Sequence, residues 1–219
     1  MKHTLTVFLA AMAAFATTAA EFEFKASDRT DPARVKGLLC SGYKASSDAS
    51  VPVRYEFVGL NENTALRIVS HGDNNVEKNS DFAHFRVYYP VTLNADVMEI
   101  SFSFKYVDCA PGKAFFLVSG FLNDIPGEKK LRGLSLRFYP DRVTMNKRVV
   151  NRDFTKGTQT FTLTLNKKNN QATLSSNGKT IATDELADGP AEAPQFRFGD
   201  GSSMVNGSVD LYFIRCSTR

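Results

Sequence analysis

Basic and aromatic side chains recur at every second residue in three segments of the chain. In segments 83–89, 98–107 and 131–139, polar residues mostly occupy one parity and apolar residues the other. Because alternate side chains of a strand lie on opposite faces, each polar set would line one face of a strand. If the three strands shared one concave sheet, they would form a groove carrying His84, Arg86, Tyr88, Lys105, Arg137 and Tyr139.

Such a groove would suit an acidic polysaccharide. An arginine fork matches a carboxylate or a sulfate, and a tyrosine ring offers a stacking face together with a hydroxyl. A sheet with one buried face, however, also needs a solvated polar face that binds nothing. The pattern therefore leaves two interpretations open, a binding site for an anionic glycan and an ordinary solvated surface.

The residues argue against most hydrolytic chemistry. A retaining glycanase needs two carboxylates about 5–5.5 Å apart, which strand neighbours at i and i+2 or i+4 can supply. At those spacings from Glu99 the chain carries Ser101 and Ser103. The chain contains no Gly-x-Ser-x-Gly motif, and neither His71 nor His84 has a recognisable nucleophile partner in the sequence. No catalytic residue is therefore predicted.

A polysaccharide lyase is the enzyme class that the residue types permit. Such an enzyme abstracts a proton beside a uronate carboxylate, and it needs a neutralising group and a base such as Tyr or His. His84, Arg86, Tyr88 and Tyr139 are of these types, but the Gln-x-His string and the Tyr-Lys-Ala-Gly segment associated with such lyases do not occur. A divergent lyase or another glycan-degrading enzyme is therefore kept as the alternative.

Turn residues and cysteines supply the remaining candidate sites. Segments 73–75 and 200–203 contain hard oxygen ligands for a structural calcium ion, although the same residues are common in turns. No other cofactor is expected. Of the three cysteines, Cys40 and Cys216 could form a disulfide if the first and last strands are neighbours, which would leave Cys109 as a thiol. Three reduced cysteines are the other interpretation, and no C-x-x-C pair suggests zinc.

The elements that would position these residues are strands almost throughout. In the last third of the chain, Phe161, Leu163 and Leu165 alternate with threonines, and a Lys-Lys-Asn-Asn tip follows. Asn177-Gly178 suits a two-residue hairpin, because both positions tolerate positive φ. About a dozen short segments separated by turn residues, none with a sustained helical period, predict an all-β sandwich or barrel.

The C-terminal segment carries a family resemblance. Phe198-Gly-Asp-Gly-Ser and the later Gly207-Ser-Val-Asp-Leu-Tyr-Phe-Ile-Arg215 resemble concanavalin A-like lectin/glucanase domains, particularly the laminin-G-like modules of secreted bacterial proteins. The resemblance covers residues 50–216 and implies a jelly-roll β-sandwich of two curved antiparallel sheets, but no activity. The tryptophan of that pattern is missing, and Tyr212 and Phe213 replace the usual pairing. We therefore expect any function to lie on the middle strands.

The N-terminus predicts export. A basic start, an apolar run over residues 5–15 and small residues at 18–20 are typical of a secretory signal. We expect a signal peptide over residues 1–20 and a single sandwich domain over residues 21–219. The protein would then be secreted, either periplasmic or extracellular.

Charge and hydropathy limit the classes of binding partner that the chain is expected to have. The net charge is +4 over 219 residues, and no Lys/Arg run is dense enough to indicate nucleic-acid binding. Beyond the signal no stretch is apolar enough to span a membrane. The absence of tryptophan disfavours stacking on a neutral glucan. We expect a non-catalytic binding or interaction module for an acidic glycan; a glycan-degrading enzyme and a structural envelope protein are the alternatives.

Overall fold

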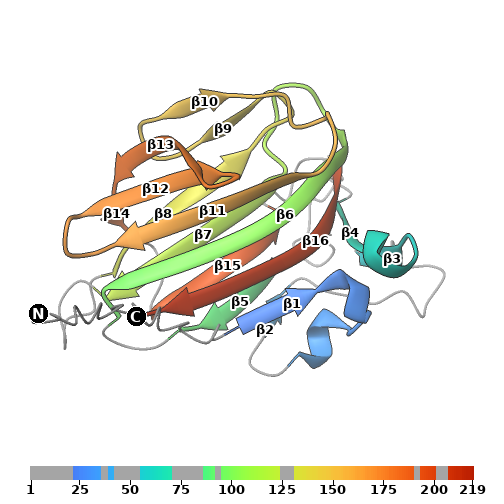
Figure 1. Cartoon of the computed structure of the whole chain (residues 1–219), viewed down its shortest axis with the longest axis horizontal. Helices are drawn as coiled ribbons and strands as arrows, with labels where there is room; N and C mark the ends of the chain where they lie inside the picture. Colours follow the sequence, from blue (N-terminus) through green and yellow to red (C-terminus); the bar gives the residue numbers. More distant parts are fainter. Residues whose placement is uncertain are drawn as a thin grey trace, which may run out of the picture.

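Two antiparallel β-sheets, stacked face to face, contain the strands of the described chain (Figure 1). The computed structural model describes residues 22–35, 39–41, 55–70, 86–91, 95–123, 131–189, 193–200 and 207–219. We call the layer at the front of Figure 1 sheet A and the layer behind it sheet B. The predicted all-β sandwich is confirmed.

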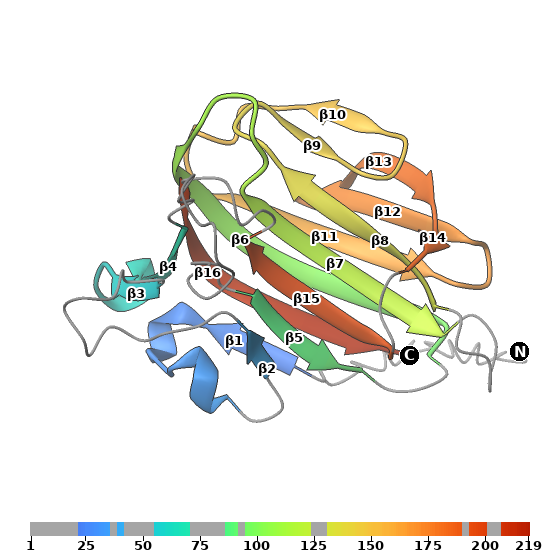
Figure 2. The ribbon, with the colours of Figure 1, turned by 180° about the vertical axis from the view of Figure 1, so that it is seen from behind.

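In the described residues each sheet has eight strands. Sheet A runs in the order β13 (Lys179–Glu185), β12 (Gln171–Ser176), β11 (Gln159–Asn166), β6 (Val97–Cys109), β16 (Gly207–Thr218), β4 (Ala65–Ser70) and β3 (Tyr55–Val58), with β1 (Phe22–Lys25) also paired to β16. Sheet B, seen from its outer side in Figure 2, runs in the order β10 (Val149–Asn151), β9 (Arg142–Thr144), β8 (Leu131–Phe138), β7 (Phe116–Asn123), β15 (Gln195–Asp200), β5 (Arg86–Pro90) and β2 (Leu39–Ser41), with β14 (Ala187–Asp188) paired to β8.

The C-terminal hairpins follow from their sequence. Phe161, Leu163 and Leu165 of β11 are fully buried, whereas the threonines between them are not. The turn that joins β12 to β13 has positive φ at both Asn177 and Gly178, as an Asn-Gly hairpin turn requires. The predicted alternation and turn are therefore confirmed.

β16 lies in the middle of sheet A. One of its edges pairs with β6 along nearly the whole length. Its other edge pairs first with β4, over residues 207–211, and then with β1, over residues 213–216. Three short 3-10 turns, η1 (Ala26–Asp28), η2 (Pro32–Arg34) and η3 (Asn61–Asn63), extend the molecule beside this second edge.

Phenylalanine rings fill the space between the sheets. The Phe104 ring lies 4.9 Å from both the Phe116 and the Phe138 ring, so it contacts sheet B directly from sheet A. Phe154, on the connection between β10 and β11, packs 5.3 Å from Phe138 in an edge-to-face geometry. Such aromatic pairs stabilise a core beyond the area that they bury.

Tyr106 adds a polar link between the two sheets. Its hydroxyl donates a hydrogen bond to the backbone carbonyl of Phe138 and accepts one from the amide of Phe116 at 3.4 Å. Burial raises the pKa of this phenol above its ordinary value, so the group stays protonated and remains a donor.

Several expectations fall on residues outside this description. These are the signal peptide over residues 1–20, the segments 73–75 and 201–203 of the expected calcium loops, and His84. No helix in the described ranges is long and apolar enough to cross a membrane.

Candidate functional site

The predicted site residues are divided between the two sheets. Lys105 belongs to β6 of sheet A, whereas Arg137 belongs to β8 of sheet B and Tyr139 directly follows β8. Arg86 and Tyr88 lie on β5 of sheet B, where only their backbone is described. The expectation of one groove containing all six residues is therefore wrong for Lys105, because its strand pairs into the opposite layer.

The outer face of sheet B is partly occupied by its own side chains. The register aligns Tyr88 with Arg197 of β15, and Arg197 with Ser119 of β7. Arg197 Nε donates to Ser119 Oγ at 2.8 Å, and its guanidinium lies 5.2 Å from the centre of the Phe121 ring. Ser119 and Phe121 are buried although their positions point outward.

The two remaining predicted residues of sheet B differ in their availability. The Tyr139 ring is covered by the guanidinium of Arg142, which lies 4.0 Å from the ring centre. Arg137 is exposed, and no acidic side chain of the described residues pairs with it. At this place sheet B thus has one cation available to a ligand, Arg137, whereas the Tyr139 ring is already covered by Arg142.

The outer face of sheet A is lined with hydroxyl groups. Ser101 and Thr162 lie opposite each other on β6 and β11, and their hydroxyl oxygens are 3.0 Å apart. Thr160 Oγ1 donates to Ser103 Oγ at 3.1 Å in the neighbouring row. Ser101 and Ser103 are buried, so the hydroxyls of Thr160 and Thr162 are the ones through which this face can exchange hydrogen bonds with a polar ligand.

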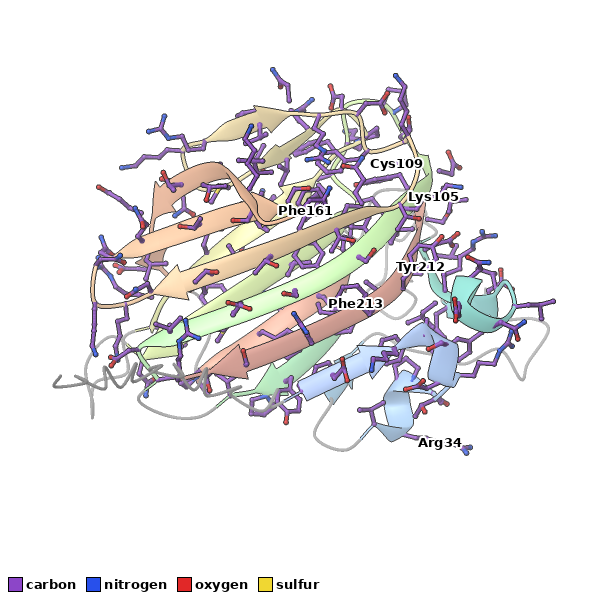
Figure 3. The ribbon with its side chains drawn as sticks, in the orientation of Figure 1. Arg34, Lys105, Cys109, Phe161, Tyr212 and Phe213 are labelled. Atoms are coloured by element: carbon purple, nitrogen blue, oxygen red, sulfur yellow. The ribbon has the colours of Figure 1, made fainter. Side chains whose placement is uncertain are left out.

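An aromatic pair lies beside these hydroxyls because β16 contains a β-bulge. The pairing with β6 places Leu211 opposite Phe104 and Phe213 opposite Ser103, so Tyr212 is the extra residue. The bulge turns Phe213 to the outer face and returns Ile214 to the core. Figure 3 shows Tyr212 and Phe213 on this face, with Lys105 farther along the sheet. Bulges often re-aim side chains next to functional sites.

A depression of about 390 Å³ lies at the aromatic pair. We call it the β16 depression. It lies where β1, η1 and η3 meet β16, and its lining combines two half-buried aromatic rings with charged and hydroxyl side chains. The lining residues are Glu23, Lys25, Ser27, Glu62, Thr64, Tyr212, Phe213 and Arg215.

Ion pairs determine which charges on this face are available. Lys25 Nζ pairs with Glu23 at 3.1 Å. Arg67 donates to both oxygens of Asp210, at 2.8 and 3.1 Å, and hydrogen bonding to this carboxylate raises the pKa of the guanidinium. Among the described residues no carboxylate lies within ion-pair distance of Lys105 or Arg215.

A second depression, of about 510 Å³, lies at the far edge of sheet A. It is lined by both acidic and basic side chains from β13 and from the turn after β9, among them Lys147, Asp184 and Glu185. Lys147 lies 3.8 Å from Glu185, and its backbone amide donates to Asp184 at 2.8 Å. This lining contains no aromatic ring, so we favour the β16 depression as the candidate site.

Metal and disulfide expectations stay predictions. Within the described ranges no group of three or more His, Cys, Asp or Glu side chains is close enough to hold a metal ion. Cys216 is buried in sheet A, and Cys40 lies on β2 of sheet B, where only the backbone is described. Cys109 directs its thiol to the carbonyl oxygens of Ala110 and Lys113, at 3.6 and 3.5 Å.

Sequence reasoning missed the aromatic pair and Arg215. Strict alternation from Val209 and Leu211 assigns Phe213 to the core, and the bulge reverses that assignment. The signal was present in the run Tyr212-Phe213-Ile214, in which neighbouring bulky residues interrupt the alternation. The expectation that any function lies on the middle strands stays a prediction.

No protein-family model and no curated protein sequence matches the chain. Several solved structures have similar folds. A conserved carbohydrate esterase from the Shiga toxin-encoding bacteriophage phi24B has a TM-score of 0.65 and 13% identity, covering 92% of this chain and 99% of its own. A cellulose induced protein has a TM-score of 0.56 and 11% identity, covering 90% and 97%. A family 7 alginate lyase in complex with product has a TM-score of 0.51 and 10% identity, covering 81% and 85%.

At these identities the likeness shows the fold alone. The chain is a jelly-roll β-sandwich of two curved antiparallel sheets, of the concanavalin A-like type, as the C-terminal resemblance implied. The more specific laminin-G-like resemblance stays a prediction.

Proposed function

We propose that this chain is a secreted, non-catalytic module that binds an acidic glycan on the outer face of sheet A. The observation that carries the proposal is the aromatic pair Tyr212 and Phe213, half-buried beside the hydroxyl rows of β6 and β11. An aromatic ring covers the apolar face of a sugar, while neighbouring hydroxyls and charges bind its polar edge. The similar folds named above include proteins that bear carbohydrate-related names.

The uncommitted cations favour an acidic ligand. Lys105 and Arg215 lie on either side of the row that contains Ser103 and Phe213. Lys105 and Ser101, which is opposite Arg215, are four residues apart on β6, which corresponds to about 13 Å of strand. An acidic sugar over the aromatic pair would have one of these cations on either side of it along the strands. Glu99, one row beyond Arg215, would oppose further negative charge at that end.

Binding by the full chain tests this proposal. The purified protein is screened against arrayed acidic and neutral glycans, and the acidic glycan bound most tightly is then titrated by calorimetry. We expect Phe213→Ala and Arg215→Ala each to weaken binding about tenfold, the effect of losing a contact worth about 1.4 kcal/mol. Val149→Ala and Arg148→Ala remove exposed side chains of β10 and of the turn between β9 and β10, and they should leave the affinity unchanged.

The predicted site on sheet B provides the contrasting outcome. If Arg137→Ala abolished binding while Phe213→Ala and Arg215→Ala had no effect, the ligand would lie on sheet B and the proposal would be wrong. Absence of binding to every arrayed glycan would instead favour the structural envelope protein.

Degradation of the same ligand is the second candidate function. Tyr212 and Arg215 line one depression. In a lyase the ionised form of such a tyrosine takes the proton beside the uronate carboxylate while the bond to the leaving sugar oxygen breaks, and the arginine neutralises the carboxylate. Incubation with uronate polymers distinguishes the two functions. A binding module leaves ultraviolet absorbance flat, whereas a lyase produces an unsaturated, absorbing product.

A further inference from the structure

The β16 depression is closed on one side by a braced wall. The wall consists of η1 and η3, which pack against each other at the edge of β16. Arg29 Nη2, just after η1, donates to the carbonyl oxygen of Gly59, just before η3, at 2.7 Å. Gly59 has a φ of +78°, and an added Cβ would lie 2.4 Å from the carbonyl oxygen of Asn63. The turn that carries η3 is thus fixed in a conformation that glycine permits.

The opposite side of the depression leads onto the hydroxyl face of sheet A. Phe213 pairs with Ser103, and Ser103 in turn pairs with Thr160 of β11. The neighbouring row of Ser101 and Thr162 continues to Ser175 of β12, away from the wall. A glycan lying over these rows would therefore meet the wall when it reaches β1. The depression has one open side and one closed side.

Its volume fits a single sugar ring. At about 390 Å³ the depression is near the lower end of the range for ligand sites, which is about 300–1,000 Å³. Tyr212 and Phe213 supply its aromatic surface, and Ser27 supplies a hydroxyl on the side of the wall.

The charges of the depression favour one negative group. Lys25 is paired with Glu23, so Arg215 is the cation of the lining that keeps its hydrogen-bond donors for a ligand. Glu62 lines the wall, and no described cation lies within ion-pair distance of it. An arginine binds a carboxylate through two parallel hydrogen bonds, whereas a carboxylate accepts hydrogen bonds from sugar hydroxyls and repels a second anion.

We propose that the β16 depression binds the terminal residue of an acidic glycan end-on. The residue is a sugar with one carboxylate, which pairs with Arg215, and with hydroxyls that donate to Glu62. This inference rests on the proposed function. It adds that the depression binds the end of the glycan chain and that the sugar bound there carries one negative charge.

The first test compares three forms of a linear oligouronate. One form has both ends free, the second has its reducing end coupled to a carrier, and the third has its non-reducing end coupled to the carrier. Calorimetry with the full chain should show that blocking one particular end weakens binding at least tenfold, while blocking the other end has little effect. Equal affinity for all three forms, or equal losses from blocking either end, would overturn end-on binding.

Two variants locate the end in the depression. Ser27→Tyr adds a ring from η1 without removing any side chain of sheet A, and it should weaken binding of the free oligouronate at least tenfold. Asn151→Tyr adds a ring at an exposed position of β10 in the opposite sheet and should have no effect. If Ser27→Tyr bound as tightly as the unaltered chain, the depression would not hold the ligand end.

The terminal carboxylate is assigned by combining ligand and protein changes. Reducing the terminal carboxylate to an alcohol should weaken binding to the unaltered chain about tenfold, but should change little in Arg215→Ala. An equal loss in both proteins would refute the pairing with Arg215. If the end-blocking and Ser27→Tyr tests fail while Phe213→Ala still weakens binding, the end-on inference falls and the proposed function stands. If Phe213→Ala also has no effect, both fall.

Discussion

At the scale of single residues, the pair Arg67–Asp210 controls which charges on sheet A remain available. Asp210 lies directly opposite Lys105 in the register, at a distance where opposite charges attract. Arg67, on the other side of Asp210, binds both of its oxygens. Lys105 thereby stays available for a ligand, although it has an acidic neighbour.

We predict that Arg67→Ala weakens glycan binding without removing a ligand contact. Once Arg67 is absent, Asp210 should turn to Lys105 and compete with the ligand's negative group. The double variant Arg67→Ala with Asp210→Asn should restore binding, because it removes the competitor. Calorimetric titration of both proteins checks this, and a double variant that binds as weakly as Arg67→Ala would contradict it.

The same pair should contribute to stability. Asp210 is 7% exposed, so its replacement by Asn leaves the Arg67 guanidinium without its charged partner in a partly buried position. We expect Asp210→Asn to lower the free energy of unfolding by about 1.5–3 kcal/mol, the range for hydrogen bonds to charged groups. Urea unfolding with an unchanged m-value measures it.

At the scale of elements, the bulge in β16 is the feature on which the proposed site depends. Tyr212 is inserted between two stretches of regular pairing, at the place where the neighbouring strand changes from β4 to β1. Without Tyr212, Leu211, Phe213 and Ile214 would alternate inward, outward and inward with no change of register. The inserted residue therefore adds a side chain to the outer surface and is not needed for the alternation that fills the core.

We predict that deletion of Tyr212 separates folding from binding. The shortened strand can keep both stretches of pairing with β6, so the chain should retain its β-rich circular dichroism and unfold cooperatively. Glycan affinity should fall more than tenfold, because half of the aromatic surface is lost. Full affinity in the deletion variant would show that the bulge has no part in the site.

Elements of this kind also determine how far sequence reasoning reaches. Alternation and turn chemistry predict β6, β8 and β11 and their inward faces correctly, because these are local properties of a strand. Alternation says nothing about which layer a strand joins. The predicted groove therefore groups Lys105 with Arg137 although long-range pairing separates them. Strict alternation would also place Phe213 in the core, because it does not reveal the inserted residue.

At the scale of the whole molecule, Phe154 holds an irregular segment against the core. It is fully buried although it lies outside any strand. Its ring packs against rings of both sheets, namely Phe104 and Phe161 in sheet A and Phe138 in sheet B. Its backbone amide donates to the carbonyl oxygen of Pro140 at 2.8 Å. The segment is therefore fixed by both packing and hydrogen bonding.

We predict that Phe154→Ala is among the most damaging single changes. Removing a fully buried ring should cost about 3–5 kcal/mol, which includes the cavity left among rings that cannot collapse into it. Phe154→Leu should cost less, because it keeps most of the volume. Urea midpoints of the two variants provide the comparison, and equal midpoints would indicate that the segment repacks.

The place of β16 in sheet A also bears on how the chain is made. Synthesis proceeds from the N-terminus, and β16 follows every other described strand in the sequence. Until β16 leaves the ribosome, sheet A consists of two separate fragments, one formed by β13, β12, β11 and β6 and the other by β4 and β3. During that time β1 has no strand to pair with. The nascent chain thus completes its fold only after translation of β16.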